Sequence, residues 1–322
     1  MKTNLFVAAS LFLIMAAGCK KIKLNKVPIA DAGPAQTIQL QTDSIILTGN
    51  GTDEDGTIMG YLWSKLAGPN IPAIHTPASA STRVTGMIAG VYRFQLMVVD
   101  DDGATGLDTV SVTILPAQLT TVTMQPGTDG QDALVITKDG DNTSPNLNIG
   151  QHTELVYSKW TYGGQGFGEG AMRSYIRFAA VSSIPANAEI LSAKLSLYGV
   201  ASSGFTPEGN SHFPGSPYGS GPDNPGWIKR VTSNWEEATI TWNNKPGTVD
   251  AGQASIPGTT TQWNFNATDI DVTDMVRTMV STNSNYGFCL TLQNEAIYRN
   301  VIFASSEATD AARRPKLVVV YR

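Results

Sequence analysis

Short runs in which apolar and polar residues alternate recur between residues 28 and 115. They occupy positions 44–48, 61–64, 92–99 and 109–114, and turn-forming residues separate them. A period of two residues places every second side chain on the same face of a strand, so one face of each strand can enter a core. The pattern predicts a β-sandwich in this part of the chain.

The same alternation continues from residue 120 to residue 322. Its runs are found at positions 174–178, 191–198, 238–242, 287–292 and 316–321. About 200 residues are enough to bury one large core, so we predict a second and larger β domain. Residues 115–118 separate the two domains.

One segment follows the helical period instead. Met275, Val276, Met279 and Val280 recur at helical spacing, which predicts a short helix over 271–280. Asp271 or Thr273 would cap its start. The fold class predicted for the chain as a whole is therefore all-β.

The chain begins with a pattern typical of a targeting signal. Lys2 precedes an apolar run at 5–17 that is too short to span a bilayer as a permanent helix. Residues 15–19 resemble a bacterial lipobox, which implies a signal peptide over 1–18 and lipidation of Cys19. An ordinary secretory signal with an incidental cysteine is the alternative.

The lipobox resemblance also implies a location. Residues 19–27 would form a lipidated stalk, with Lys20, Lys21, Lys23 and Lys26 near anionic headgroups. The expected partner is a membrane, reached through the N-terminal lipid anchor. The expected location is the bacterial cell envelope, at the outer membrane.

Composition and charge exclude several classes of protein. With 41% hydrophobic and 15% charged residues, the chain is unlike a disordered protein. Its formal net charge of −5 and the lack of a dense basic face argue against nucleic acid as a partner. The second cysteine, Cys289, lies in a strand-like run, where a buried thiol is expected.

The first β domain resembles the PKD-type immunoglobulin-like family. The resemblance rests on residues 28–34, 49–58 and 99–104, together with Trp63. It implies an immunoglobulin-like β-sandwich over 28–115, with Trp63 in the core. Such domains commonly act as spacers between an anchor and a working module.

The region 120–322 resembles the DNRLRE family of carbohydrate-binding modules. The residues that carry the resemblance lie at 176–178, 183–185, 193–198, 231–246, 270–273, 285–288, 303–307 and 314–317. It implies a jelly-roll-like β-sandwich and, for some members, binding of an acidic polysaccharide such as alginate. Between 202 and 226 this chain carries a longer insert, rich in glycine, proline and aromatic residues.

Aromatic residues in loops are the candidates for stacking against sugar rings, because working residues concentrate in loops. The predicted ligand-binding aromatics are Trp160, Tyr162, Phe213, Tyr218 and Trp227; Phe205, His212 and Phe167 lie in the same loops. Trp235 and Trp242 are interpreted as core instead, because they lie in a strand-like alternation.

Basic residues could add recognition of uronic-acid carboxylates. Arg173 and Arg230 are the candidates, since a guanidinium matches a carboxylate with two parallel hydrogen bonds. Surface charge, or a pair with Glu236 or Glu237, is the alternative role.

Clustered acidic residues suggest Ca²⁺ as a structural cofactor. In the first domain, Asp53, Asp55, Asp100 and Asp102 should gather at one end, because the loop before the Trp63 strand and the last hairpin loop meet there. In the second domain the candidates are Asp129 and Asp132. A solvated acidic turn is the alternative in both places.

Together these features predict a membrane-anchored, non-catalytic surface lipoprotein that binds polysaccharide alongside other surface glycan-utilisation proteins. A protein-binding adhesin or structural surface protein is the second hypothesis. A polysaccharide lyase is the third, with His152 or His212 as its base. No nucleophile elbow, phosphate-binding loop or zinc-protease motif occurs in the sequence.

Overall fold

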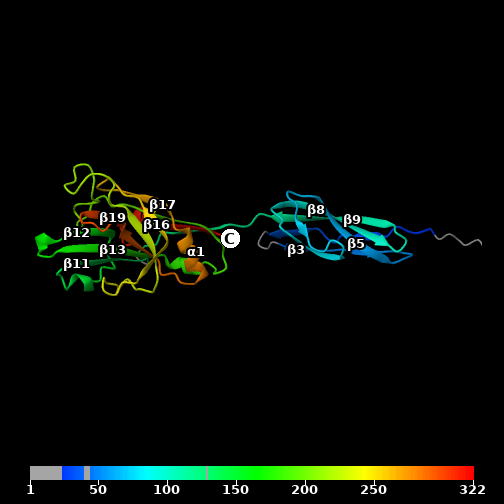
Figure 1. Cartoon of the computed structure of the whole chain (residues 1–322), viewed down its shortest axis with the longest axis horizontal. Helices are drawn as coiled ribbons and strands as arrows, with labels where there is room; N and C mark the ends of the chain where they lie inside the picture. Colours follow the sequence, from blue (N-terminus) through cyan, green and yellow to red (C-terminus); the bar gives the residue numbers. More distant parts are fainter. Residues whose placement is uncertain (1–23, 40–43, 128–129) are drawn as a thin grey trace, which may run out of the picture. The chain divides into compact units, whose positions relative to one another are not determined.

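Two separately packed units divide the chain, one of residues Met1–Gln118 and one of Leu119–Arg322. The computed structural model describes residues 24–39, 44–127 and 130–322 (Figure 1). The predicted signal peptide, the lipidated Cys19 and Asp129 lie outside the described residues.

The first unit is an immunoglobulin-like sandwich. Its larger sheet has the order β2 (Gln36–Gln39), β9 (Thr105–Leu115), β8 (Gly90–Asp100), β5 (Ile58–Ala67). The second sheet has the order β3 (Ser44–Thr48), β7 (Ser81–Thr85), β6 (Ala73–Ile74), and β1 (Ile29–Asp31) pairs with β4 (Asn50–Thr52). The β2–β9 pair is parallel and the other pairs are antiparallel.

The alternation in the sequence explains the core of this unit. Along β8, Tyr92, Phe94, Leu96 and Val98 are buried, while the residues between them are more exposed. Trp63 is buried beside them, and its indole nitrogen donates a hydrogen bond to the Ala80 carbonyl at 3.3 Å. The predicted strands and the core position of Trp63 are confirmed.

The second unit is a larger β-sandwich of antiparallel strands. One sheet has the order β10 (Thr120–Met124), β20 (Lys316–Tyr321), β14 (Ile190–Leu197), β17 (Ala267–Asp271). The other has the order β16 (Thr248–Ile256), β15 (Gly226–Val231), β18 (Phe288–Leu292), β13 (Glu169–Arg177), β12 (Glu154–Thr161), β19 (Arg299–Ala304), and β11 (Gln131–Lys138) also pairs with β13.

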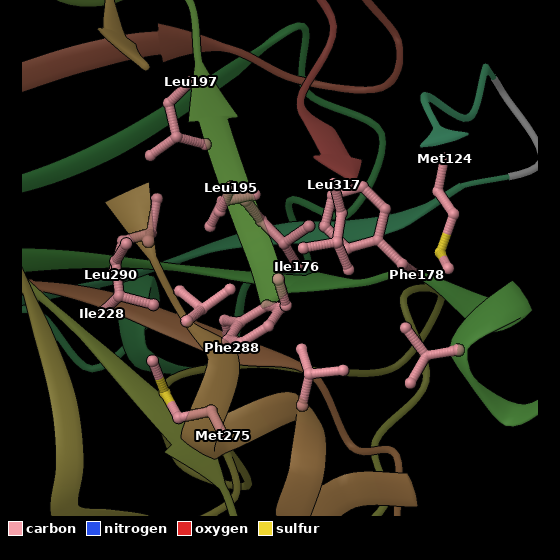
Figure 2. Packing of buried hydrophobic residues seen from close by; sticks show 14 of the residues in the cluster. Met124, Ile176, Phe178, Leu195, Leu197, Ile228, Met275, Phe288, Leu290 and Leu317 are labelled. Atoms are coloured by element: carbon pink, nitrogen blue, oxygen red, sulfur yellow. The ribbon is translucent and has the colours of Figure 1, made fainter. Parts of the chain in front are cut away.

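The core of the second unit lies between these sheets. Figure 2 shows side chains from both of them converging, among them Leu195 and Leu317 from one sheet and Ile228, Phe288 and Leu290 from the other. Cys289 lies between Phe288 and Leu290 in the sequence of β18 and belongs to a separate buried cluster, so its thiol is buried as expected.

Helix α1 (Thr273–Ser281) closes one end of this core, and Met275 is its labelled contact in Figure 2. The predicted helix is confirmed, but its predicted cap is wrong, since Val272 holds the cap position without a side-chain bond. The Thr273 hydroxyl accepts from the Ala193 amide of β14 at 2.9 Å instead. Asp271 still accepts from the Thr273 amide at 3.0 Å.

The predicted strand at 238–242 is wrong, because this segment is a turn. The amides of Thr239 and Ile240 both bond back to the Glu236 carbonyl, at 3.0 and 2.9 Å. Four short 3₁₀ turns complete the described elements of this unit: Ser144–Asn146, Gly163–Gln165, Ala179–Ser183 and Ala311–Arg313.

Candidate functional site

Three aromatic rings from distant parts of the second unit meet beside β12. Trp160 lies near the end of that strand, Tyr218 lies in the insert, and Tyr298 precedes β19. The Trp160 ring centroid is 4.6 Å from that of Tyr218 and 5.4 Å from that of Tyr298, with edge-on geometry in both cases. The two tyrosines stack on each other at 5.0 Å. Together they hold the Trp160 ring in one orientation.

The insert reaches this place because buried polar side chains fasten it to β19. The Asn300 amide donates to the Ser211 hydroxyl at 2.9 Å, and the Asn224 side-chain amide donates to the Asn300 carbonyl at 3.3 Å. Asn210 accepts from the Ile302 amide at 2.9 Å. All three side chains of the insert are buried. The 202–226 insert is therefore a packed part of the domain, which fixes the position of Tyr218.

A cleft of about 280 Å³ opens against Trp160. Tyr162 and Phe205 line it with their rings, while Ser158, Met172 and Asn300 are buried residues of its lining. The remaining lining residues are Thr161, Gly164, Gln165, Thr206, Pro207 and Glu208. The cleft thus combines aromatic walls with hydroxyl, amide and carboxylate side chains that can form hydrogen bonds with a polar ligand.

The hairpin after β12 places Tyr162 on the backbone of β13. A Cβ on Gly170 would stand 2.6 Å from the Tyr162 ring, so this close approach requires glycine at that position. The ammonium group of Lys138 lies 4.7 Å from the centre of the Tyr162 ring and donates to the side-chain oxygen of Gln165 at 2.9 Å. Tyr162 is therefore held between strand backbone and a cation.

Burial raises the pKa of Tyr162 to about 12, and the negative charge of Glu208 contributes to the shift. The pKa of Tyr218 is also raised, by burial first and then by Glu208 and Tyr298. Both phenols therefore keep their protons near neutral pH and remain hydrogen-bond donors.

The other predicted ligand residues lie outside this cleft. Phe213 lies in the insert and Trp227 in β15, and neither lines it. Arg173 packs over the Trp242 ring at 5.2 Å and forms a 2.7 Å ion pair with Glu295. Arg230 lies in β15 and also does not line the cleft. Of the predicted ligand residues, Trp160 and Tyr162 thus line the cleft, Tyr218 packs against Trp160 without lining it, and both arginines lie elsewhere.

Sequence reasoning missed Tyr298 and Glu208. Tyr298 stands in the polar turn before β19, so an aromatic residue in polar surroundings was the available signal. Glu208 had no distinguishing signal. Trp235 is buried as predicted, and its indole nitrogen donates to the Tyr286 carbonyl at 2.9 Å.

The acidic residues of the first unit meet as the topology predicted. The Thr57 amide donates to Asp101 at 2.7 Å across the two loops. One oxygen of Asp53 is buried without a hydrogen-bond partner, and a Cβ on Gly56 would stand 2.4 Å from it and 2.3 Å from an Asp101 oxygen. Two carboxylates thus converge around Gly56.

The remaining acidic candidates of this unit are bound to neighbouring groups. Asp100 accepts from the amides of Asp102 and Ala104, at 3.1 and 2.8 Å. Asp55 accepts from the Lys26 amide at 3.2 Å. Across residues 24–39, 44–127 and 130–322, no group of three or more His, Cys, Asp or Glu side chains could hold a metal ion. Calcium stays a prediction.

Asp132 in the second unit is almost completely buried. One of its oxygens accepts from the Ser306 amide at 2.7 Å, and the other has no hydrogen-bond partner. Burial and the nearby Glu307 carboxylate hold the pKa of Asp132 well above its usual value.

A second and more open cavity of about 740 Å³ lies beside Glu237. Burial raises the pKa of Glu237 to about 7, and Glu307 adds to the shift. His152 lines this cavity, packs against the Phe205 ring at 4.5 Å and accepts from the Glu154 amide at 3.2 Å. His212 is buried, and desolvation lowers its pKa.

Comparison with known proteins identifies both units. Residues 32–114 match a PKD-domain family model, and residues 218–321 match the model of carbohydrate-binding module family 96. The chain is thus a PKD domain followed by a β-sandwich that contains a family 96 carbohydrate-binding module. The second match includes Tyr218, Tyr298 and Asn300, whereas β12 and the start of the insert lie outside it.

Individual relatives match parts of the chain. Human low-density lipoprotein receptor-related protein 11 is 34% identical over 94 residues, which are 29% of this chain and 19% of that protein. The chain therefore spans about a fifth of this relative. A solution structure of the PKD domain from KIAA 1837 protein is 31% identical and covers 30% of this chain and 94% of its own, with a TM-score of 0.27.

A structure of a carbohydrate-binding module from the β-sandwich superfamily is 12% identical and covers 92% of this chain and 97% of its own, with a TM-score of 0.22.

Proposed function

We propose that the second unit binds polysaccharide in the cleft between Trp160, Tyr162 and Phe205. One observation carries the proposal: a domain that matches a carbohydrate-binding family presents a cleft walled by aromatic rings. An aromatic face covers the C–H face of a sugar ring, and the apolar area removed from water stabilises the contact at about 25 cal/mol per Å².

Capture without cleavage is the activity that the cleft supports. Hydrolysis of a glycosidic bond usually requires two carboxyl groups on opposite sides of the bond. Among the described residues lining this cleft, Glu208 is the one carboxylate. A lyase would require a base beside the bound sugar, and the two candidate histidines do not line the cleft.

A more specific form of the proposal is that the ligand is an acidic glycan such as alginate. Binding of such a glycan requires cations that face the ligand. Arg173 is the best placed candidate, because a second cation lies close to it. Arg173 packs over the ring of Trp242, and the ammonium group of Lys245 lies 4.0 Å from the centre of the same ring. This pair lies outside the aromatic cleft. Binding of alginate would therefore use a different part of the domain from the cleft.

We further propose that the chain is a lipoprotein of the bacterial cell envelope, anchored at the outer membrane through Cys19. The lipobox-like residues 15–19 support the anchor, and the PKD domain between anchor and binding domain supports a spacer role. Other surface glycan-utilisation proteins would then supply the cleavage of the bound polysaccharide.

The test is binding of the soluble chain, residues 20–322, to a panel of polysaccharides by affinity electrophoresis and calorimetry. Trp160→Ala and Tyr162→Ala should each weaken binding by about 10- to 100-fold, because each removes a stacking surface worth roughly 1–3 kcal/mol. Trp227→Ala, an aromatic change outside the cleft, is the matched control and should bind like the parent.

Unchanged binding by both cleft variants would remove this cleft as the site. Failure of the parent chain to bind any polysaccharide would favour a protein-binding adhesin instead, since aromatic clefts also serve as hot spots for protein partners.

A further inference from the structure

Two cations lie against one tryptophan ring outside the aromatic cleft. The Arg173 guanidinium of β13 packs over the Trp242 ring, with its central carbon 5.2 Å from the ring centre. The Lys245 ammonium group lies 4.0 Å from the same centre and donates a hydrogen bond to the Trp242 carbonyl at 2.8 Å. Each cation is attracted to the π electrons of the ring. Trp242 therefore holds two positive charges close together.

One carboxylate serves both of these charges. Glu295 forms a 2.7 Å ion pair with Arg173, whereas Lys245 forms no ion pair within residues 24–39, 44–127 and 130–322. Like charges repel at short range, and one carboxylate leaves an excess of one positive charge beside the ring. This place therefore favours an anionic group from outside the chain.

Arg173 is held more firmly than its carboxylate partner. The Arg173 side chain is 31% exposed and stacked on Trp242, so most of it packs against the domain. The Glu295 side chain is 45% exposed and lies in the loop between β18 and β19, where its other contact is the Thr291 hydroxyl at 3.4 Å. An ion pair with an exposed carboxylate contributes little free energy. Glu295 can therefore leave while Arg173 stays in place.

A ligand carboxylate can replace Glu295 without leaving Arg173 unpaired. It offers the guanidinium the same charge and the same acceptor oxygens, and it adds attraction to Lys245. A neutral sugar hydroxyl carries no charge, so it would break the ion pair without replacing it. Glu295 thus opposes neutral ligands at this place more strongly than it opposes anionic ones.

We infer that Arg173 and Lys245, held by Trp242, form a subsite for a carboxylate of an acidic polysaccharide, and that Glu295 occupies this subsite until that carboxylate displaces it. Glu295 is then the residue that restricts the subsite to charged sugars. The inference rests on the proposed function, since it locates and regulates the binding of acidic glycans by the same domain. The subsite lies outside the aromatic cleft, so loss of one would leave the other intact.

The test measures binding of the soluble chain, residues 20–322, to alginate, polygalacturonate and neutral mixed-linkage β-glucan by calorimetry. Arg173→Gln should weaken binding of the acidic probes by about tenfold or more and leave any binding of the neutral probe unchanged, because charge-assisted hydrogen bonds are lost. Arg173→Lys should lose nearly as much, since an ammonium group lacks the planar fork of a guanidinium. Added NaCl should weaken binding of the acidic probes alone.

Glu295→Gln tests the displacement. It should strengthen binding of the acidic probes by about two- to fivefold, because it removes an exposed ion pair that competes with the ligand. Glu189→Gln is the matched control: Glu189 precedes β14 of the other sheet, and its exposed carboxylate forms a 2.7 Å ion pair with Arg322. This control removes the same charge and should leave binding unchanged.

Thermal melts establish which variants fold. Lys245→Gln keeps the test decisive if the Arg173 variants unfold, since it should weaken acidic binding severalfold without removing a side chain from the sheet.

Acidic binding that survives in both Arg173→Gln and Lys245→Gln would overturn the inference, and its loss in Trp160→Ala would then leave the proposed function standing. Binding of the neutral probe alone would have the same meaning. Equal gains in Glu295→Gln and Glu189→Gln would show an effect of net charge and overturn the role of Glu295. Failure of the parent chain to bind any probe would instead overturn the proposed function.

Discussion

At the scale of single residues, Glu237 shows how packing sets protonation. Gly150 lies so close that a Cβ there would stand 2.7 Å from Cγ of the Glu237 side chain, and the Asn148 side chain donates to the Glu237 carbonyl oxygen at 2.6 Å. This segment removes water from the Glu237 side chain, and Glu307 adds negative charge. The pKa therefore rises to about 7.

The direction of the pH dependence follows from this shift. A carboxyl whose pKa is higher in the folded than in the unfolded chain binds more protons when folded, so it stabilises the fold at low pH. The contribution is lost as the pH rises from the ordinary value of 4.5 towards 7. We predict that Glu237→Gln flattens part of the decline in melting temperature between pH 5 and pH 7.5.

Scanning calorimetry at several pH values measures this effect. Glu236→Gln, a neighbouring carboxylate that is exposed and pairs with Arg177, is the control and should keep the decline. Asp132 has a raised pKa as well, so some decline should persist in the Glu237 variant. A Glu237→Gln curve parallel to that of the parent would contradict the assignment.

Asp53 gives the calcium prediction its sharpest test. Its buried, unpartnered oxygen and the Asp101 oxygen lie on two sides of Gly56, where a cation would relieve their repulsion. Millimolar Ca²⁺ should raise the melting temperature of the first unit relative to chelator, and Asp53→Asn should abolish the increase. Identical melts in Ca²⁺ and chelator would leave an acidic loop without a metal.

At the scale of elements, Trp235 anchors the turn that covers the outer face of the β13 sheet. Its ring packs with Tyr175, Val231 and Cys289 and is 5% exposed. Trp235→Ala should therefore cost about 3–5 kcal/mol in the free energy of unfolding, as large-to-small core changes do. Denaturant titration measures the loss. Trp227→Ala, in the same sheet but only half-buried, should lose clearly less, and an equal loss would contradict the anchoring role.

The strands show how far alternation predicts structure and where it stops. The named runs matched β3, β5, β8 and β9 of the first unit and β13, β14, β18 and β20 of the second. Strands such as β11 and β12 were not named, and because runs of consecutive residues in them are buried, they carry no alternation. Alternation failed at 238–242, where Asn244 accepts from the Thr241 amide at 2.6 Å and donates to the Thr239 carbonyl at 2.9 Å. These side-chain bonds replace a strand ladder, and a hydrophobic pattern does not contain them.

The aromatic cleft was only partly predictable for a similar reason. Loop position singled out Trp160, Tyr162 and Tyr218, but the contact of Tyr218 with Trp160 depends on buried serine and asparagine contacts between the insert and β19. Such contacts have no periodic signature. Arg173 and Arg230 lie outside this cleft, and their role stays a prediction, because guanidinium chemistry suggests a ligand equally well on any face of a sheet.

At the scale of the whole molecule, the proposed lipid anchor would decide where the carbohydrate-binding domain works. Within residues 24–39, 44–127 and 130–322, no helix has the length and apolar character needed to cross a bilayer. Stable attachment through lipid instead takes two or more acyl chains, since one chain binds reversibly. The acyl groups require the thiol of Cys19, which follows the lipobox-like residues.

Replacement of that thiol is therefore the test of attachment. Cys19→Ala should abolish incorporation of labelled fatty acid and leave uncleaved precursor, because the peptidase acts on the acylated cysteine. Cys289→Ala is the matched control: that thiol is buried in β18, burial raises its pKa to about 11, and its loss should leave labelling intact. Labelling that persists in Cys19→Ala would contradict the anchor, and the PKD domain would then separate the binding domain from something other than a membrane.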